Sequence, residues 1–483
     1  MNKLIPSRSI PFILVSIFAI LSLSSGPAAR VEDGTCTFWV APPPLGSDAN
    51  PGTQARPWAS LEHAGKTVPD AGCTVWINDG VYNGESQIKR RFTAYTFFKA
   101  VHPYKAIFQN LGPALTIKGA RRVVVQGLVF QHSGPGATPL VVQVERSSTV
   151  WAEYIILRDN IFRNSYNNDL LKVYDGARFV TVQNNLFYNQ GSGEQHMDVN
   201  SVSDVRIQEN VFFNDFAGSV RPVLNDTKHY IVIKDSNGAD DGLIGSLRIT
   251  VQRNIFMNWQ GDPGEAFLQV GNDGKPYYEA RQVMVQNNLF LGNSPNPMTD
   301  PFGVSGAANV TFRNNTVSGD LPSSAYATRI VIKGSNPKNS NILFCNNIWS
   351  DPTGTMNNFS DGDRASTTNL VLNHNLYWNG GKAIPAGDVF SPLVNDRTRR
   401  VANPKLAASF AGLLLPEWNG SKFPSGNLRI RSEFLRLARA YASVPSTSPA
   451  VWKADPACAP KTDILGKPRG LAPSYGAYQG PIK

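Results

Sequence analysis

The chain has 483 residues, with 46 Lys and Arg against 36 Asp and Glu, a net charge of +10 at pH 7 and four cysteines. This length can bury a large core, and so few cysteines exclude a small scaffold held together by disulfides. The positive charge favours an anionic partner, but basic residues form only short runs such as 89–91 and no recognition motif, so we expect no nucleic-acid partner.

Residues 1–29 have the organisation of a signal peptide. Lys3 and Arg8 precede an apolar run at 11–23, and small residues follow it. The run is short for a membrane span. We therefore predict a soluble mature protein that is secreted or periplasmic and not inserted in a membrane. Removal of the peptide also removes Lys3 and Arg8, which lowers the net charge to +8.

The four cysteines lie in different contexts. Cys36 and Cys73 occupy two strand-like runs and could pair in an oxidising compartment. Cys345 sits inside an apolar strand, and we interpret it as a buried, unreactive thiol. Cys458 is either free or paired with Cys345, and the sequence leaves this choice open.

A short motif recurs along the chain, with an asparagine after an alternating strand. The eight copies are Asn160, Asn185, Asn210, Asn254, Asn288, Asn315, Asn347 and Asn375, between 25 and 44 residues apart. No helix follows each strand, which excludes leucine-rich repeats, and the shortest steps leave no room for a four-stranded propeller blade. We predict a β-solenoid with coils of roughly 25 residues. The asparagines should occupy left-handed turn positions and bond to their copies along the axis.

This pattern resembles the right-handed parallel β-helix of the pectate lyase-like superfamily over about residues 35–390. The stretch GSDANPGTQARPW resembles the opening motif of that group, and the residues after it (Trp58, Leu61, Ala64 and Val68) have the spacing of a helix that covers the first coil. DILGKPRGLAPSYGAYQG is similar to its closing tail. We predict a signal peptide over 1–29, an all-β helix with a helical cap over 30–390, and a closing segment over 391–483 with a helix near 434–442.

A third strand in each coil is the expected site, because the resemblance implies that this strand lines the substrate cleft. Strand alternation predicts an inward column of Val173, Val199, Ile233, Val270, Val304 and Ile332. The outward columns then contain Lys172, Asp198 and Gln269, followed by Tyr174, Asn200 and Lys234. His196 and Tyr230 are expected to begin the same outward face. The long loops around this strand also favour a functional site there.

These residue types suit β-elimination on a uronic-acid polymer. The reaction needs a base, and a cation or basic side chain must neutralise the sugar carboxylate. We predict catalytic roles for Lys234, Lys172, Arg221 and His196. We predict substrate contacts for Tyr174, Tyr230, Asn200 and Gln269. We predict that Asp198, Glu194, Asp169 and Asp235 hold a metal ion, with Ca²⁺ as the candidate cofactor.

Several functions remain open because this fold hosts lyases, hydrolases, epimerases and non-enzymatic proteins. The preferred interpretation is a monomeric polysaccharide lyase acting on an acidic polysaccharide. The main alternative is a non-catalytic carbohydrate-binding or cell-surface protein that uses Tyr174, Tyr230 and Trp259. A uronan epimerase and a hydrolase are further alternatives. The hydrolase ranks below a lyase or an epimerase, since the Gly-His-Gly segment of polygalacturonase-like hydrolases is absent from the sequence.

Overall fold

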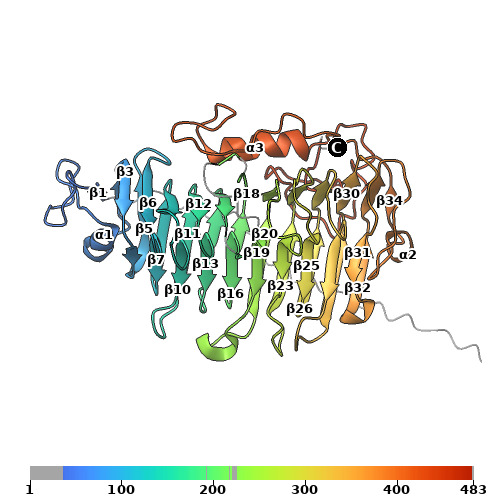
Figure 1. Cartoon of the computed structure of the whole chain (residues 1–483), viewed down its shortest axis with the longest axis horizontal. Helices are drawn as coiled ribbons and strands as arrows, with labels where there is room; N and C mark the ends of the chain where they lie inside the picture. Colours follow the sequence, from blue (N-terminus) through green and yellow to red (C-terminus); the bar gives the residue numbers. More distant parts are fainter. Residues whose placement is uncertain (1–35, 192, 217, 220–225, 481–483) are drawn as a thin grey trace, which may run out of the picture. The chain divides into compact units, whose positions relative to one another are not determined.

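Three parallel sheets wrap around one core in the computed structural model (Figure 1), which describes residues 36–480 apart from 192, 217 and 220–225. The predicted signal peptide lies outside these residues. Consecutive strands visit the three sheets in turn, so that β11, β12 and β13 form one coil and β14 begins the next. The predicted right-handed parallel β-helix is confirmed.

Within each sheet, neighbouring strands follow one another in chain order. Sheet A contains β1 (Thr37–Val40), β2 (Thr74–Ile77), β5 (Arg91–Ala100), β8 (Arg121–Gln126), β11 (Glu153–Arg158), β14 (Thr181–Gln183), β17 (Arg206–Gln208), β20 (Ser246–Gln252), β23 (Ala280–Gln286), β26 (Ala307–Arg313), β29 (Asn339–Cys345) and β32 (Thr367–Asn373). Sheet B contains β3 (Gly80–Asn83), β6 (Ala106–Asn110), β9 (Val129–His132), β12 (Ile161–Ser165), β15 (Leu186–Gln190), β18 (Val211–Phe213), β21 (Ile255–Phe256), β24 (Leu289–Leu291), β27 (Thr316–Ser318), β30 (Ile348–Asp351), β33 (Leu376–Asn379) and β34 (Arg400–Val401). Sheet C contains β4 (Ser86–Ile88), β7 (Leu115–Lys118), β10 (Val142–Glu145), β13 (Leu171–Tyr174), β16 (Met197–Asn200), β19 (His229–Lys234), β22 (Ala266–Val270), β25 (Asp300–Ser305), β28 (Thr328–Val331) and β31 (Ser360–Gly362). The helices are α1 (Leu61–Thr67), α2 (Pro392–Asn395) and α3 (Ile430–Tyr441), with short 3₁₀ turns at Gly238–Asp241 and Arg364–Ser366.

The eight repeated asparagines form a buried ladder at the corner between sheets A and B. Asn185 is typical, since its Nδ2 donates to Leu157 O at 2.9 Å and to Asn210 Oδ1 at 3.1 Å. The left-handed residue is the one before each asparagine, such as Asn184 with φ 55°. The prediction that the repeated asparagine itself adopts this conformation is therefore wrong. The repeated amide is needed because the turn leaves buried backbone groups that only a side chain can satisfy.

The solenoid core is built largely from stacked side chains of equivalent positions. Phe162, Phe187, Phe212, Phe256 and Phe290 form a continuous stack with ring centroids 4.6–5.0 Å apart. This spacing follows from the distance between neighbouring strands, because each ring repeats once per coil.

The outer face of sheet B is also apolar, and the C-terminal segment covers it. Leu186 and Phe213 point outward from their strands and are buried in one cluster with Trp418, Phe434 and Leu437. The predicted helix near 434–442 is confirmed as part of α3, which lies along this face (Figure 1). Residues 391–480 therefore run back along the solenoid, and sheet B offers no open face to a ligand where they cover it.

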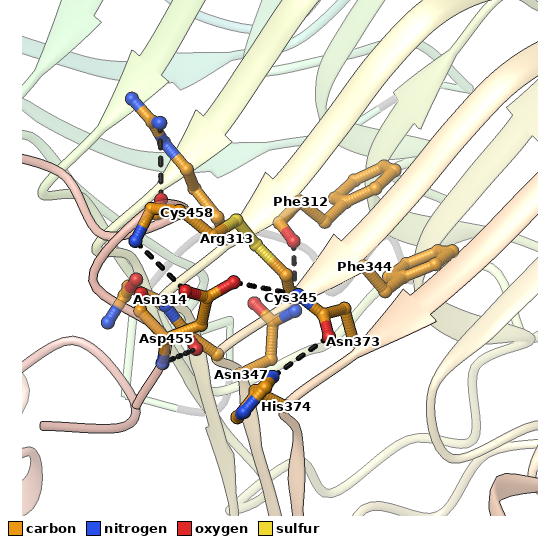
Figure 2. The surroundings of a disulfide bond; sticks show 12 residues. Phe312, Arg313, Asn314, Phe344, Cys345, Asn347, Asn373, His374, Asp455 and Cys458 are labelled. Carbon is orange, nitrogen blue, oxygen red and sulfur yellow. Dashed lines mark hydrogen bonds between the residues drawn. A yellow bond between two sulfur atoms is a disulfide. The ribbon is translucent and has the colours of Figure 1, made fainter. Parts of the chain in front are cut away.

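Both cysteine pairs form disulfides, Cys36–Cys73 and Cys345–Cys458. The prediction that Cys345 is an unreactive thiol is wrong, because the C-terminal segment brings Cys458 against β29 (Figure 2). Asp455 strengthens this junction, since its backbone N–H donates to Asn346 Oδ1 at 2.8 Å.

The predicted N-terminal cap is confirmed. Ser60 ends the preceding extended segment, and its Oγ accepts a hydrogen bond from His63 N at 3.1 Å, which satisfies a free backbone donor of α1. Leu61, Ala64 and Val68 are fully buried against the first coils. Covering this end protects the exposed edges of the stacked strands.

Candidate functional site

The outer face of sheet C carries the predicted polar columns. Lys172 pairs in register with Asp198, and Asn200 pairs with Lys234 in the next coil. The inward column is confirmed as far as Val304, but its last member is Ile330, because β28 is shifted by two residues from the predicted register. Ile332 lies outside the strand and is 40 % exposed.

An acidic cluster occupies the strands and loop ends of two neighbouring coils. Asp169, Gln195 and Asp198 are each at most 2 % exposed, and Lys172 Nζ lies 2.8 Å from Asp198 Oδ2. Three oxygens of this cluster are buried and have no hydrogen-bond partner: Asp169 Oδ2, Gln195 Oε1 and Asp198 Oδ1. Unsatisfied buried oxygens carry a large desolvation cost, which makes them unusual in a folded protein.

The charges of the cluster influence one another strongly. Burial raises the pKa of Asp169 well above its usual range, and the negative charge of Asp198 raises it further. Burial lowers the pKa of Lys172, but Asp198 and Asp169 outweigh this effect and raise it above its ordinary value. The negative charge of the half-buried Glu194 also raises the pKa of both Asp169 and Lys172. The cluster therefore favours a bound proton or a cation.

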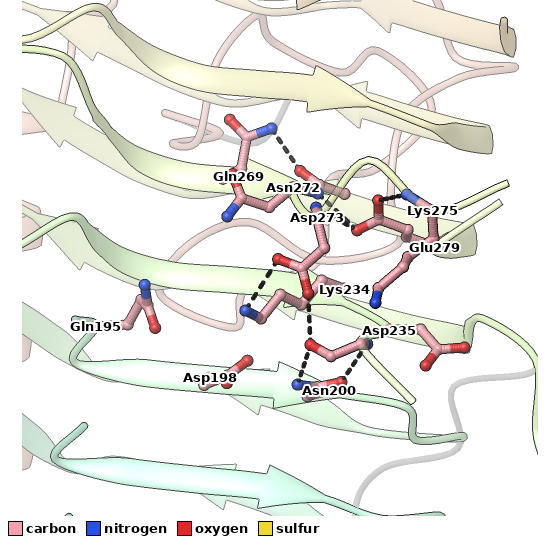
Figure 3. Close-up of polar contacts among 12 residues, drawn as sticks. Gln195, Asp198, Asn200, Lys234, Asp235, Gln269, Asn272, Asp273, Lys275 and Glu279 are labelled. Carbon is pink, nitrogen blue, oxygen red and sulfur yellow. Dashed lines mark hydrogen bonds and ion pairs between the residues drawn. The ribbon is translucent and has the colours of Figure 1, made fainter. Parts of the chain in front are cut away.

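Lys234 lies one coil beyond Asp198 in a second polar group (Figure 3). Its Nζ is 3.2 Å from Asp273 Oδ1, and Ser236 Oγ donates to Asp273 Oδ2 at 2.5 Å. Asn200 Nδ2 donates to Ser236 Oγ at 2.8 Å, so Asn200 and Lys234, which are neighbours in one outward column, belong to one network. Burial lowers the pKa of Lys234, whereas Asp198 and Asp273 raise it, and the net shift is upward.

Glu279 fixes the turn that supplies Asp273. Its carboxylate is fully buried and accepts hydrogen bonds from the backbone N–H groups of Asn272, Asp273 and Lys275 at 2.8–3.1 Å (Figure 3). Such backbone anchoring positions Asp273 opposite Lys234 without using the side chain of Asp273 itself.

Three residues predicted for binding or catalysis lie inside the solenoid. His196 and Tyr230 are fully buried, with ring centroids 4.2 Å apart, and Trp259 packs 5.1 Å from Tyr230. Their predicted place on the outer face is wrong. His196 directly precedes β16, Tyr230 is the second residue of β19 and Trp259 follows β21, and the three rings pack on one another away from solvent. Burial lowers the pKa of His196 to about 3, although its hydrogen bond to Asn214 opposes this.

The remaining predicted residues have mixed placements. Tyr174 is half-buried and its hydroxyl donates to Glu145, while Gln269 Nε2 donates to Gly271 O at 2.6 Å. Asp235 accepts hydrogen bonds from three backbone N–H groups of its own loop at 2.6–2.9 Å, away from the acidic cluster. Arg221 lies outside the described residues.

Sequence reasoning missed Gln195 and Asp273. Gln195 is a neutral amide, and its position between Glu194 and His196 was the only signal in the sequence that it belongs to the cluster. Asp273 follows a strand by three residues, and only the folded turn shows that it reaches back to Lys234.

The oxygen donors of the cluster match the ligand preference of Ca²⁺, which binds carboxylate and amide oxygens. In the part of the chain that the structure describes, no three His, Cys, Asp or Glu side chains converge closely enough to hold a metal ion. Asp169 and Asp198 supply two carboxylates, Gln195 supplies an amide, and Lys172 already neutralises one oxygen. The donor chemistry fits a cation, and closer convergence of these side chains would be needed to bind it.

Comparisons with known proteins show the fold and leave the activity open. No protein-family model and no curated protein matches the chain significantly. Among solved structures, the chain is similar to pectate lyase Pel9A (TM-score 0.53, 12 % identity, covering 93 % of this chain and 97 % of that chain). It is also similar to XylC in complex with xylose (0.51, 11 %, 93 % and 99 %) and to the GH136 lacto-N-biosidase from Eubacterium ramulus (0.52, 10 %, 76 % and 67 %). The chain is a right-handed parallel β-helix protein with a polar outer face on sheet C. Among its described residues, no helix is long and apolar enough to cross a membrane.

Proposed function

We propose that this protein is an exported polysaccharide lyase that cleaves a uronic-acid polymer by β-elimination on the outer face of sheet C. The observation that carries the proposal is the set of three unpartnered, buried oxygens of Asp169, Gln195 and Asp198 beside two lysines. A charged, partly desolvated face of this kind suits a reaction in which a sugar carboxylate must be neutralised. The lyase named among the similar structures supports the choice only through its fold.

Lys234 is the proposed base. Its amine would take the proton adjacent to the sugar carboxylate, and the electron pair would form a double bond as the glycosidic oxygen leaves. The ion pair with Asp273 orients the amine, and neutralisation of Asp198 would remove one charge that raises the pKa of Lys234. Ca²⁺ held by Asp169, Glu194, Gln195 and Asp198 would neutralise the sugar carboxylate.

A non-catalytic carbohydrate-binding protein is the second candidate. Lys172 and Lys234 are each paired with a carboxylate, and both have raised pKa values, which favour a protonated amine over a base. The buried positions of Tyr230 and Trp259 weaken this candidate, because neither ring can stack on a sugar.

The test is the ultraviolet absorbance of an unsaturated uronate during incubation with pectate, alginate and glycosaminoglycans, with Ca²⁺ or with a chelator. We expect rising absorbance on one polymer, loss of the signal in chelator, and at least a hundredfold slower rise for Lys234→Ala. Lys338→Ala is the matched control, since Lys338 is an exposed lysine outside this face. A folded protein that produces no unsaturated product from any uronate polymer would reject the lyase and favour the binding protein.

A further inference from the structure

A second cluster of charged side chains lies further along the same face of sheet C. A pocket there is lined by residues of β19, β22, β25 and β28 and of the loops beside them, among them His229, Glu265, Gln269, Asp300, Arg329 and Lys333. None of these residues except Gln269 belongs to the site proposed from the sequence.

The pocket lies beside a position where the outward column lacks a side chain. Asp198, Val232, Gln269, Gly303 and Arg329 are in register in successive coils. The amide of Gln269 lies over Gly303, since a Cβ there would come within 2.0 Å of Gln269 Oε1. Coils are spaced by about 4.8 Å, so Gln269 lies roughly 10 Å and Arg329 roughly 19 Å from Asp198 along the solenoid.

Lys333 differs from Lys172 and Lys234 in its partner. Lys172 and Lys234 each form an ion pair, at 2.8 Å and 3.2 Å. Lys333 is half-buried and its Nζ donates to the neutral amide oxygen of Asn272 at 2.7 Å, and no carboxylate of a described residue lies within 4.0 Å. A half-buried ammonium that forms no direct ion pair is energetically costly, and a bound anion would relieve that cost.

The neighbouring carboxyl groups of the described residues act on Lys333 from a distance, with Glu265 as the strongest opposite charge. Glu265 Oε2 lies 3.1 Å from His229 Nε2, but burial lowers the pKa of His229 to about 3, so this imidazole is neutral and does not balance the carboxylate. Asp361 pairs with Arg329 at 3.0 Å. Asp300 is 1 % exposed with Oδ1 unpartnered, and burial raises its pKa well above the usual range. Burial lowers the pKa of Lys333 and Arg329 lowers it further, although Glu265 opposes them. Burial and Arg329 therefore outweigh Glu265, and an anion bound beside Lys333 would stabilise its protonated form.

The pocket is connected to the proposed catalytic residues through one turn. The side chain of Asn272 accepts a hydrogen bond from Lys333. The adjacent Asp273 pairs with Lys234 (Figure 3). Glu279 holds both backbone N–H groups of this turn. A chain of sugars that follows the solenoid axis would therefore pass both lysines.

We propose that Lys333, with Arg329 beside it, binds the carboxylate of a second uronic-acid unit of the polymer, at a subsite distinct from the acidic cluster. This inference rests on the proposed function, and it specifies the substrate as a glycan with carboxylates on more than one unit. Gln269 and Thr299 supply neutral hydrogen-bonding groups to the hydroxyls of the same sugar.

Equilibrium binding in a Lys234→Ala background tests the subsite without turnover. Calorimetry would measure the binding of tetrasaccharides of galacturonate, mannuronate, guluronate and glucuronate units. The tetrasaccharide that binds most tightly would then be compared with its carboxyl-reduced form. We expect Lys333→Gln to weaken the binding of the uronate tetrasaccharide at least tenfold. The same variant should weaken the binding of the carboxyl-reduced sugar less than twofold. Lys333→Arg should retain binding, and Lys338→Gln, which removes an exposed lysine five residues away, should change nothing.

The outcomes separate the two proposals. Unchanged uronate binding by a folded Lys333→Gln protein would overturn the subsite, and so would the absence of binding to every uronate tetrasaccharide. Elimination by the parent protein in the absorbance assay would leave the proposed function standing in either case. Conversely, weaker binding by Lys333→Gln together with no elimination product would support the subsite and reject the lyase.

Discussion

The side-chain amide of Asn375 donates a hydrogen bond to Asp396 Oδ2 at 2.9 Å, so the asparagine ladder ends on a carboxylate. The same oxygen accepts Asn375 N at 3.0 Å and the hydroxyl of Tyr377 at 3.1 Å. Asp396 is fully buried and takes the place that the next asparagine would occupy in a further coil. The last coil is thus closed by the segment that follows it.

Replacing Asp396 by alanine should destabilise the C-terminal coils. Three buried donors would lose their acceptor, at a cost of about 1–3 kcal/mol for each donor left unsatisfied. Asp396→Asn keeps an acceptor oxygen in the same place and should cost less. Urea unfolding of both variants measures the difference, and equal stability of the alanine variant and the wild type would contradict this role.

The disulfide Cys345–Cys458 should contribute more stability than Cys36–Cys73. The first pair closes a segment of 113 residues and the second a segment of 37, and the longer loop loses more entropy when it is closed in the unfolded chain. We expect the double serine variant at 345 and 458 to lose about 2–5 kcal/mol. Hydrogen exchange should locate the loosening near Asp455, whose contacts lie beside this bond (Figure 2). If hydrogen exchange of the variant increased uniformly across the chain, the disulfide would not stabilise this region locally.

The asparagine repeat was sufficient to predict the fold, because one buried amide per coil is a requirement of the turn and leaves a regular trace in the sequence. The sequence could not set the register of β28, since Ile330 and Ile332 fit the same alternation and only the length of the preceding loop decides between them. The prediction for His196 was wrong, because this residue directly precedes β16 and its orientation is set by the loop before the strand, not by the strand alternation. Lys172 and Asp198 were placed side by side correctly, since both lie within regular strands.

The stability of the protein should depend on His196 in mildly acidic solution. Burial lowers the pKa of this imidazole to about 3, against about 6.5 in an unfolded chain. Below pH 6.5 the unfolded state binds a proton that the folded state does not, so the stabilisation is present above this pH and is lost as the pH falls towards 3. The expected loss is about 1.4 kcal/mol per pH unit.

Comparison with His196→Gln isolates this contribution. Burial also lowers the pKa of His229 to about 3, but His229 is present in both proteins and its contribution cancels. Between pH 6 and pH 4, the unfolding free energy of the wild type should fall more steeply than that of the variant. Parallel pH profiles would show that His196 titrates normally in the folded state.

The ion pair of Lys172 and Asp198 offers a test of the cation site that does not depend on activity. Lys172 Nζ lies 2.8 Å from the buried carboxylate of Asp198, and Lys172→Met would leave that charge beside Asp169 without compensation. Breaking such a buried pair should cost about 3–5 kcal/mol in the presence of a chelator. The variant also frees one more oxygen for a cation, so Ca²⁺ should raise its Tm more than that of the wild type. Lys234→Met is the matched control, because it removes a lysine paired with Asp273 and leaves Lys172 on Asp198. If Ca²⁺ shifts the Tm of all three proteins equally, the acidic cluster does not hold the ion, and Lys172 alone balances its charge.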